Sequence, residues 1–391
     1  MGTSTSQKAM PRAPSNATLL LLLVAMVVSS VAAGWAQPAQ ELTIYLGPAT
    51  RPWSETHRLV PFDAALTPQG EGRMLLVGGR IETRTPAGGG QRAHVWLVNV
   101  EEYLPGVVAA EIGPDAPRAA MQALAVVART FALRALRHPQ RHDVGWPLCL
   151  TIRSQAYRAQ PASFRAVATA IEATRGKVLV SPGAGGRPVL SFTPHHASCG
   201  GYLSCAAVAW PTGSGGCPDH SLLRDSDVMS GPAPDLTREV TLRAWLSSPP
   251  LEAWCWPPRE GLPSYAEGRA RWQRVLPAGS PEARLMASME VLRRGPGGHI
   301  AEFRLNGRTM RGDITTRDLI EPRLQSSRFV VDVHPSGQVV LRGGGAGHGV
   351  GMCQLGARAR AAAGQDWQDM LAAYFPESTV VHVSELLAAR P

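Results

Sequence analysis

The chain has 391 residues, of which 44% are hydrophobic, so it can bury the core of one large domain or two ordinary ones. Its formal net charge is +9, and almost all of the basic charge comes from arginine scattered along the chain. No basic block with interleaved aromatic residues occurs, and the composition therefore does not support a nucleic-acid partner.

The N-terminus has the pattern of an export signal. Lys8 and Arg12 precede an apolar run at 17–33, and small residues follow around Ala36. The length of the run leaves an uncleaved membrane anchor as the alternative. We expect residues 1–40 to be a signal peptide or membrane anchor with a linker. The folded part would lie in the periplasm or cell envelope, where a basic surface favours anionic polymers, and only an uncleaved N-terminal segment would contact the membrane.

Residues 41–94 are expected to form a β-rich segment. Short alternating apolar runs between Gly and Pro turns predict strands at Leu42–Tyr45, Met74–Val77 and His94–Val98. A helix follows Gly113-Pro114-Asp115, with Asp115 as its N-cap.

The rest of the chain alternates between helical and strand patterns. Residues 218–265 are rich in Pro and Ser and are expected to be an elaborated loop region. The other expected elements are helices at 163–174, 354–363 and 367–374, strands at 178–180, 290–292 and 301–305, and a hairpin pairing 328–333 with 338–342. The fold class is therefore α+β, with mixed helices, small antiparallel sheets and inserted loops.

Three separated motifs carry the chemical signal. Residues 102–111 read Glu-Tyr-Leu-Pro-Gly-Val-Val-Ala-Ala-Glu, and the helix after them contains Ala-Val-Val-Ala-Arg-Thr-Phe-Ala at 125–132. Residues 151–158 contain Gln-Ala-Tyr, and residues 347–357 read Gly-His-Gly-Val-Gly-Met-Cys-Gln-Leu-Gly-Ala. The apolar turn before Glu111 predicts a raised proton affinity for this carboxyl, as a general acid requires.

Together these motifs resemble the stage II sporulation protein D family, which includes amidase-enhancer proteins, over about 95–385. The resemblance implies an envelope protein that cleaves peptidoglycan glycan strands, preferably stripped of peptides, as a lytic transglycosylase. Glu111 matches the family's catalytic glutamate and would act as the single acid and base, in a fold arranged around a glycan cleft. No cofactor is required for this chemistry. The alternative is a noncatalytic glycan-binding enhancer of a cell-wall amidase, favoured by Ala119 and Leu124, which replace polar family residues.

The motifs also supply candidate glycan contacts, each with a structural alternative. The sequence alone allows Glu111 to pair with Arg129, and Glu101 and Glu102 to be solvated or capping groups. The residues with a predicted substrate-binding role are Arg129, Thr130, Gln155, Tyr157, Ser198, His348 and Gln354.

A cysteine–histidine cluster is the second chemical feature. His195, His196, Cys199 and Cys205, followed by Cys217 and His220, are dense enough for a structural zinc ion. The family resemblance implies zinc bound by cysteine and histidine in this neighbourhood. Export favours the alternative, a Cys199–Cys205 or Cys205–Cys217 disulfide. Cys353 occupies a serine position of the family, and no activating context makes it a nucleophile.

Overall fold

The computed structural model describes residues 41–49, 57–60, 74–86, 89–137, 146–150, 154–158, 164–211, 225, 234–248, 252–256 and 260–388. The predicted export segment therefore lies outside the described residues. The chain divides into two compact units, 1–41 and 42–391, and every element below belongs almost entirely to the second. Its elements are the mixed helices and small sheets of an α+β protein, which confirms the predicted fold class, while the glycan cleft stays a prediction.

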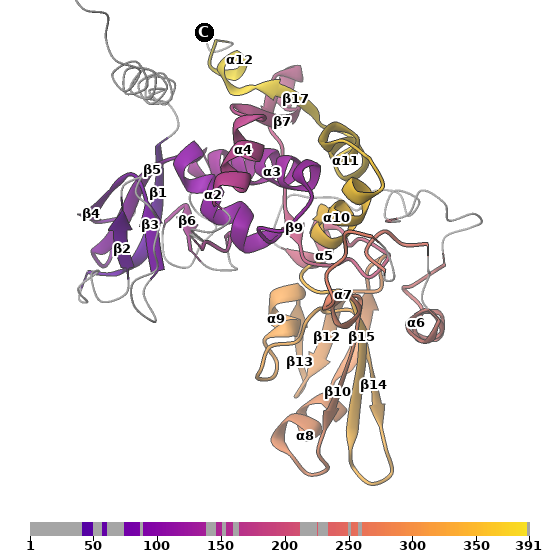
Figure 1. The fold of residues 1–391 in the computed structure, drawn as a ribbon. Coiled ribbons are helices and arrows are strands. Elements are labelled where there is room, and N and C mark those ends of the chain that lie inside the picture. Colours follow the sequence, from indigo (N-terminus) through magenta and orange to yellow (C-terminus); the bar gives the residue numbers. More distant parts are fainter. Residues whose placement is uncertain are drawn as a thin grey trace, which may run out of the picture. The chain divides into compact units, whose positions relative to one another are not determined.

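The N-terminal strands form small sheets beside the first helices (Figure 1). One sheet has the order β4-β5-β1-β6, in which β5 pairs antiparallel with β4 and β1 pairs parallel with β6. A second sheet pairs β2 with β3, also in parallel. The strands are β1 (Glu41–Pro48), β2 (His57–Val60), β3 (Met74–Val77), β4 (Arg80–Arg84), β5 (Ala93–Asn99) and β6 (Leu148–Cys149).

Three mutually contacting helices build the main core: α2 (Val100–Glu111), α3 (Arg118–Arg137) and α4 (Phe164–Glu172). Asn99 caps α2 by accepting a hydrogen bond from the Glu101 N–H at 2.9 Å. The many alanines of α3 favour a helix and let its neighbours approach closely. Among the described helices, α3 alone is long and apolar enough to cross a membrane, yet 67% of its most apolar window is buried, as in a core helix.

The chain returns to this core near its C-terminus. Helices α10 and α11 pack on α3, and β17 pairs antiparallel with β7 in the sheet β17-β7-β8. Strands β9 and β16 pair in parallel. These elements are β7 (Lys177–Pro182), β8 (Pro188–Leu190), β9 (His195–His196), β16 (Met352–Cys353), α10 (Gln354–Ala362), α11 (Trp367–Tyr374), β17 (Thr379–His382) and α12 (Val383–Ala388).

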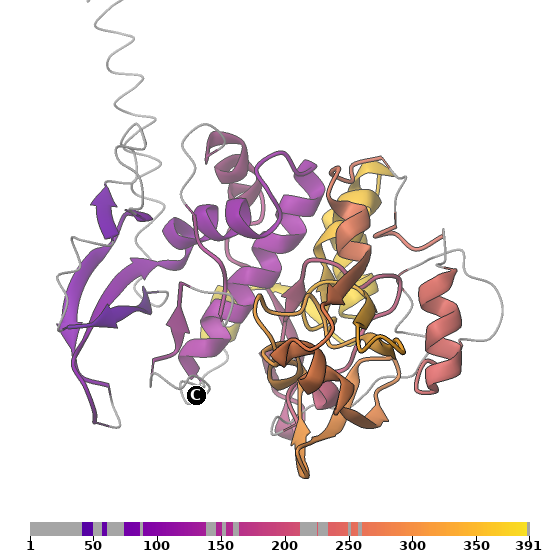
Figure 2. The ribbon, with the colours of Figure 1, turned by 90° about the horizontal axis from the view of Figure 1, so that it is seen from below.

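Two further sheets, β10-β15-β14 and β11-β12-β13, enclose a second cluster of buried apolar residues. Figures 1 and 2 both place them on a different side of the helices from β4 and β5. The predicted hairpin is confirmed as β14 with β15. The elements here are α7 (Ala266–Ala270), β10 (Arg271–Leu276), α8 (Pro281–Ala287), β11 (Glu290–Arg294), β12 (Ile300–Leu305), β13 (Arg308–Arg311), α9 (Asp313–Arg317), β14 (Phe329–Val333) and β15 (Val339–Gly344).

The structure corrects three expectations. The predicted loop region contains a helix, α6 (Glu239–Ser247). The short helices η4 (Ala184–Gly186) and α5 (Ala206–Ala209), outside that region, are also not predicted from the sequence. The small sheets are not all antiparallel, because three strand pairs are parallel. Asp115 does not cap α3, which begins at Arg118; its carboxylate instead accepts a hydrogen bond from Arg358 at 2.9 Å.

Candidate functional site

Glu111 is the last residue of α2 and is the centre of the site. One carboxylate oxygen, Oε1, accepts a hydrogen bond from the Ala156 N–H at 2.7 Å, and Oε2 accepts one from Gln354 Nε2 at 2.8 Å. His195 Nε2 lies 3.7 Å from Oε1. The Glu111 side chain is 17% exposed, so it is held on several sides and still reaches solvent.

These neighbours shift the pKa of Glu111 in the direction opposite to the predicted one. Burial raises the pKa of its carboxyl, but the nearby imidazole of His195 and the hydrogen-bond donors Ala156 and Gln354 outweigh burial. The pKa is therefore lowered from its usual value. The sequence-based expectation of a raised pKa is wrong for the free protein, because it counted the apolar helix and not the donors contributed by distant segments.

The Gln-Ala-Tyr motif positions the Ala156 N–H. Gln155 is fully buried; its Oε1 accepts a hydrogen bond from the Tyr103 hydroxyl at 3.2 Å, and its Nε2 donates to Ala128 O at 3.3 Å. Tyr157 is buried and stacks on Tyr103, with ring centroids 5.8 Å apart. Because both flanking side chains are anchored in the core, the backbone between them is fixed with its N–H toward Glu111. Gln155 and Tyr157 therefore support the site from behind.

Gln354 reaches Glu111 from the first turn of α10. The strand pair β9–β16 sets its place, since Met352 lies opposite His195 and Cys353 opposite His196 in register. The same pairing brings His195 to the carboxylate. Two predicted residues thus meet at Glu111, although the sequence predicts His195 as a metal ligand and not as a neighbour of the acid.

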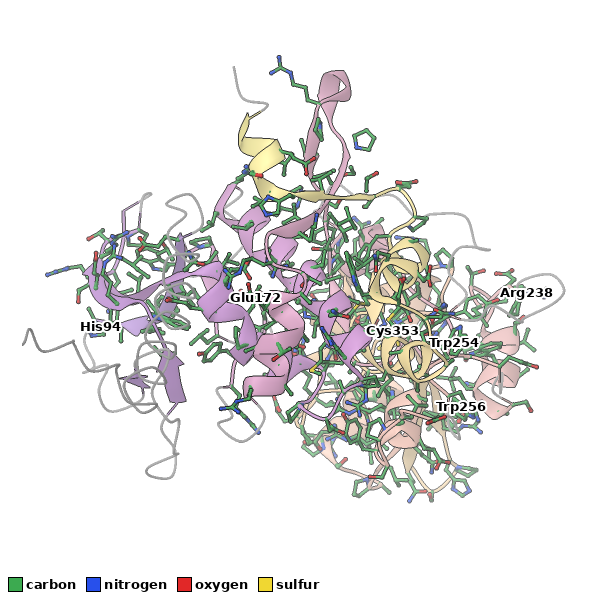
Figure 3. The ribbon with its side chains drawn as sticks, turned by 45° about the horizontal axis from the view of Figure 1, so that its top comes forward. His94, Glu172, Arg238, Trp254, Trp256 and Cys353 are labelled. Carbon is green, nitrogen blue, oxygen red and sulfur yellow. The ribbon has the colours of Figure 1, made fainter. Side chains whose placement is uncertain are left out.

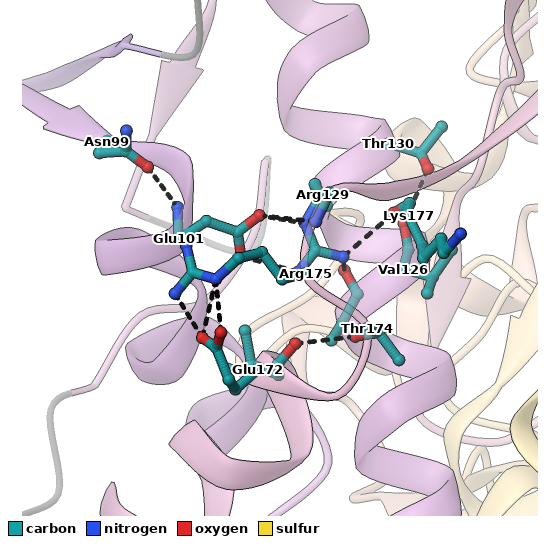
Figure 4. Close-up of polar contacts among 12 residues, drawn as sticks. Asn99, Glu101, Val126, Arg129, Thr130, Glu172, Thr174, Arg175 and Lys177 are labelled. Atoms are coloured by element: carbon teal, nitrogen blue, oxygen red, sulfur yellow. Dashed lines mark hydrogen bonds and ion pairs between the residues drawn. The ribbon is translucent and has the colours of Figure 1, made fainter. Parts of the chain in front are cut away.

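Arg129 is committed elsewhere in the fold. Its guanidinium donates two hydrogen bonds of 2.8 Å to the two carboxylate oxygens of Glu101 (Figure 4). Both side chains are buried, at 0% and 4% exposed. Arg129 therefore does not pair with Glu111, and the expectation of a solvated or capping Glu101 is wrong. The pair ties α2 to α3, because Glu101 belongs to α2 and Arg129 to α3. Glu101 also accepts a hydrogen bond from the Gly176 N–H at 3.2 Å.

Thr130 and Ser198 are also used inside the fold. The Thr130 hydroxyl donates to Val126 O at 2.7 Å and accepts from the Leu179 N–H at 2.9 Å. Ser198 is 1% exposed, and its hydroxyl accepts from the Gly200 N–H at 3.2 Å. In this conformation neither side chain presents a free surface to a glycan, so both have structural roles.

His348 belongs to a group of aromatic rings next to the site. Its ring lies 5.6 Å from that of His196 and 4.8 Å from that of Trp210, and its Nδ1 accepts from the Val350 N–H at 3.0 Å. Burial lowers the pKa of His348 well below its usual value, and the charges of His196 and His195 lower it further. His348 is therefore a neutral ring that shapes the turn before β16.

The predicted four-residue zinc set does not form one site. Cys205 is disulfide-bonded and cannot bind a metal, whereas Cys199 is a thiol, which excludes a Cys199–Cys205 disulfide. Cys217 and His220 lie outside the described residues. His196 Nδ1 lies 3.1 Å from the Val350 carbonyl oxygen. Cys199 instead lies in a cluster with Asp225, Cys255 and Cys353.

Sequence reasoning missed three features of the site. It did not assign the Ala156 N–H, the Glu101 partner of Arg129, or the cluster around Cys199. A signal existed for the first, because two large residues flank Ala156 and their burial would fix the amide between them. The other two join residues far apart in the chain and left no local pattern.

Comparisons with known proteins match part of the chain to a described family. Residues 89–180 match the model of a family described as Stage II sporulation protein. This range contains Glu111, Arg129 and the Gln-Ala-Tyr segment. An uncharacterized protein of Brachyspira hyodysenteriae is 26% identical over 282 residues, which cover 71% of this chain and 65% of that protein. The chain thus spans about two thirds of the length of the relative it matches.

Proposed function

On the premise that the chain belongs to the stage II sporulation protein family through residues 89–180, we propose that it is a lytic transglycosylase. Membership of this family indicates a role connected with the cell wall. Its substrate would be the glycan strand of peptidoglycan, preferably stripped of peptides, and Glu111 would be the catalytic acid and base. The protein would act after export, in the periplasm or envelope.

The observation that supports this proposal is the arrangement of donors around a carboxylate that still reaches solvent. Ala156, Gln354 and His195 approach Glu111 from three separate segments of the chain. Such a convergence fixes the carboxylate in one orientation, as acid–base chemistry requires. In the described part of the chain, the contacts of Glu111 include no second carboxylate, so the chemistry proposed uses a single acid/base group.

A single carboxyl is sufficient for intramolecular transglycosylation. Protonated Glu111 gives its proton to the bridging oxygen, and the C1–O bond breaks to leave an oxocarbenium-like sugar. The resulting carboxylate takes the proton from the C6 hydroxyl of the same sugar as O6 bonds to C1. The products are a 1,6-anhydro end and a new free end, no water is consumed, and Glu111 is protonated again.

The lowered pKa of Glu111 in the free protein places a condition on this cycle. The proton must be present when the glycan is bound, and desolvation is the effect here that favours the protonated form. A glycan that covers the exposed part of the Glu111 side chain removes its remaining water and raises its pKa. The acid would thus form on binding.

The same lowered pKa favours the alternative, a noncatalytic glycan-binding enhancer of a cell-wall amidase, if glycan binding does not raise it. The two substitutions in α3 say little about this choice. Leu124 is fully buried in the core, and Ala119 packs against that core. Neither is among the contacts of Glu111.

Glu111→Gln separates the two functions. The amide keeps the shape and can still accept from Ala156, while Gln354 can turn its own amide to bond with it. Wild-type protein should release fragments with 1,6-anhydro ends from peptide-stripped glycan, measured by mass spectrometry, and Glu111→Gln should lower the rate at least about a hundredfold. Glu82→Gln, in an exposed pair with Arg80, is the matched control and should keep full activity.

Wild-type protein that yields no anhydro ends, but stimulates an amidase on intact peptidoglycan, would establish the enhancer role. Unchanged cleavage by a folded Glu111→Gln variant would instead show that another group supplies the proton.

A further inference from the structure

A buried cluster of three cysteines and one aspartate lies at the N-terminal end of α10. Cys199, Asp225, Cys255 and Cys353 each offer one ligand atom, and these four atoms all lie within 4.8 Å of one another. Cys199 Sγ is 3.2 Å from Asp225 Oδ2 and 3.5 Å from Cys255 Sγ. All four side chains are at most 1% exposed. The cluster is separate from the contacts of Glu111 and has no role in the proposed reaction.

Backbone N–H groups point at the sulfur atoms of the cluster. Cys255 Sγ accepts from the Gly201 N–H at 3.2 Å, and Cys353 Sγ accepts from the N–H groups of Cys199 and Gly356, both at 3.3 Å. Gly201 has a φ of 94°, a conformation that glycine adopts without strain. A neutral thiol is a weak acceptor, so donors arranged in this way favour thiolate sulfur, the form that binds metals.

The two carboxylate oxygens of Asp225 have different contacts. Its Oδ1 accepts hydrogen bonds from the Tyr374 hydroxyl at 2.8 Å and from Arg360 Nη2 at 3.4 Å. Its Oδ2 faces the sulfur of Cys199. Metal-binding carboxylates are commonly oriented by hydrogen bonds of this kind, which leave one oxygen for the ion.

The balance of charges around the cluster also favours a bound cation. As metal ligands, the three cysteines and the aspartate would carry four negative charges, and two buried arginines lie nearby. Arg360 is 4% exposed and pairs with Asp225, while Arg328 is 0% exposed and donates to the carbonyl of Cys199. In the described part of the chain Arg328 has no carboxylate partner. A divalent cation in the cluster would balance the two remaining negative charges, and buried charge needs such balance.

From this geometry we propose that Cys199, Asp225, Cys255 and Cys353 bind one Zn²⁺ ion in a closed, structural, tetrahedral site. Zinc bonds of about 2.3 Å to sulfur place neighbouring tetrahedral ligand atoms roughly 3.5–3.8 Å apart, close to the separations observed. Thiolate ligands select zinc over magnesium or calcium. All four ligands come from the protein, so no position remains for a catalytic water.

The site would fix the start of α10. Cys353 caps this helix by accepting from the Gly356 N–H, and the next residue is Gln354, which bonds to Glu111 (Figure 3 labels Cys353 beside α10). Zinc at Cys353 would therefore join the segments of Cys199, Asp225 and Cys255 to α10, the helix whose Gln354 bonds to Glu111. A Cys199–Cys255 disulfide is the competing chemistry. It would remove two of the four zinc ligands and leave only Cys353 and Asp225.

Metal analysis of the full-length exported protein tests the proposal. Protein purified without chelators should contain about one zinc per chain by plasma mass spectrometry. Cys255→Ala and Asp225→Asn should each reduce this content severalfold. Cys149→Ala, which removes a buried thiol outside the cluster, is the matched control and should retain the zinc.

A second measurement does not depend on the folding of variants. Wild-type protein exchanged with Co²⁺ should show thiolate-to-metal charge-transfer bands and the intense visible bands of tetrahedral cobalt. Wild-type protein that carries neither zinc nor cobalt, or peptide mapping that shows a Cys199–Cys255 disulfide, would overturn the proposal. Metal content is measured without glycan, so this outcome is independent of whether Glu111 cleaves the substrate.

Discussion

The buried pair of Glu101 and Arg129 offers the sharpest test of how the site is supported. In Arg129→Met the apolar side chain fills similar space and removes two hydrogen bonds of 2.8 Å to Glu101. The carboxylate would keep its hydrogen bond from the Gly176 N–H, at 3.2 Å, as its remaining described contact. Breaking a buried pair in this way destabilises a protein by about 3–5 kcal/mol. Urea unfolding followed by tryptophan fluorescence measures the loss.

The double variant Glu101→Leu with Arg129→Met separates the pair from packing. Removing both charges leaves no buried ion, so its loss should be only about 1–2 kcal/mol, from the bonds that Arg129 donates to the Ala125 and Lys177 carbonyls. Glu290→Gln, in an exposed pair with Arg304, is the control and should change stability by less than about 1 kcal/mol. A loss below about 1 kcal/mol in Arg129→Met, or a double variant that loses as much stability as Arg129→Met alone, would refute this account of the pair.

Two further predictions concern the acid itself and its support. Gln354→Leu removes a hydrogen bond that lowers the pKa of Glu111, so the alkaline limb of kcat/KM should move to higher pH; no movement, or movement to lower pH, would contradict this. Gly106→Ala would place a Cβ atom 2.2 Å from the Tyr157 ring, and should destabilise the protein by about 1–3 kcal/mol in urea unfolding and lower activity by displacing Ala156. Gly268→Ala, with open space around the new atom, is its control.

Glu111 itself shows the limit of local inference. The sequence places it directly after an apolar turn, and in the structure it is the last residue of α2. Its proton affinity was predicted with the wrong sign, because burial is only one of the effects on a carboxyl. The donors that outweigh burial lie 45 and 243 residues away in sequence.

Periodicity, turn residues and short motifs are local properties, so the α+β class, the family motifs, about half of the described strands and fewer than half of the helices could be predicted from the sequence. Which charged and sulfur groups face one another depends on how distant segments pack. Arg129 pairs with Glu101 and not Glu111, and Cys199 lies with Asp225 and Cys353 and not with Cys205. Such partners come from segments that only packing brings together. Their spacing along the chain therefore carries no trace of the contact.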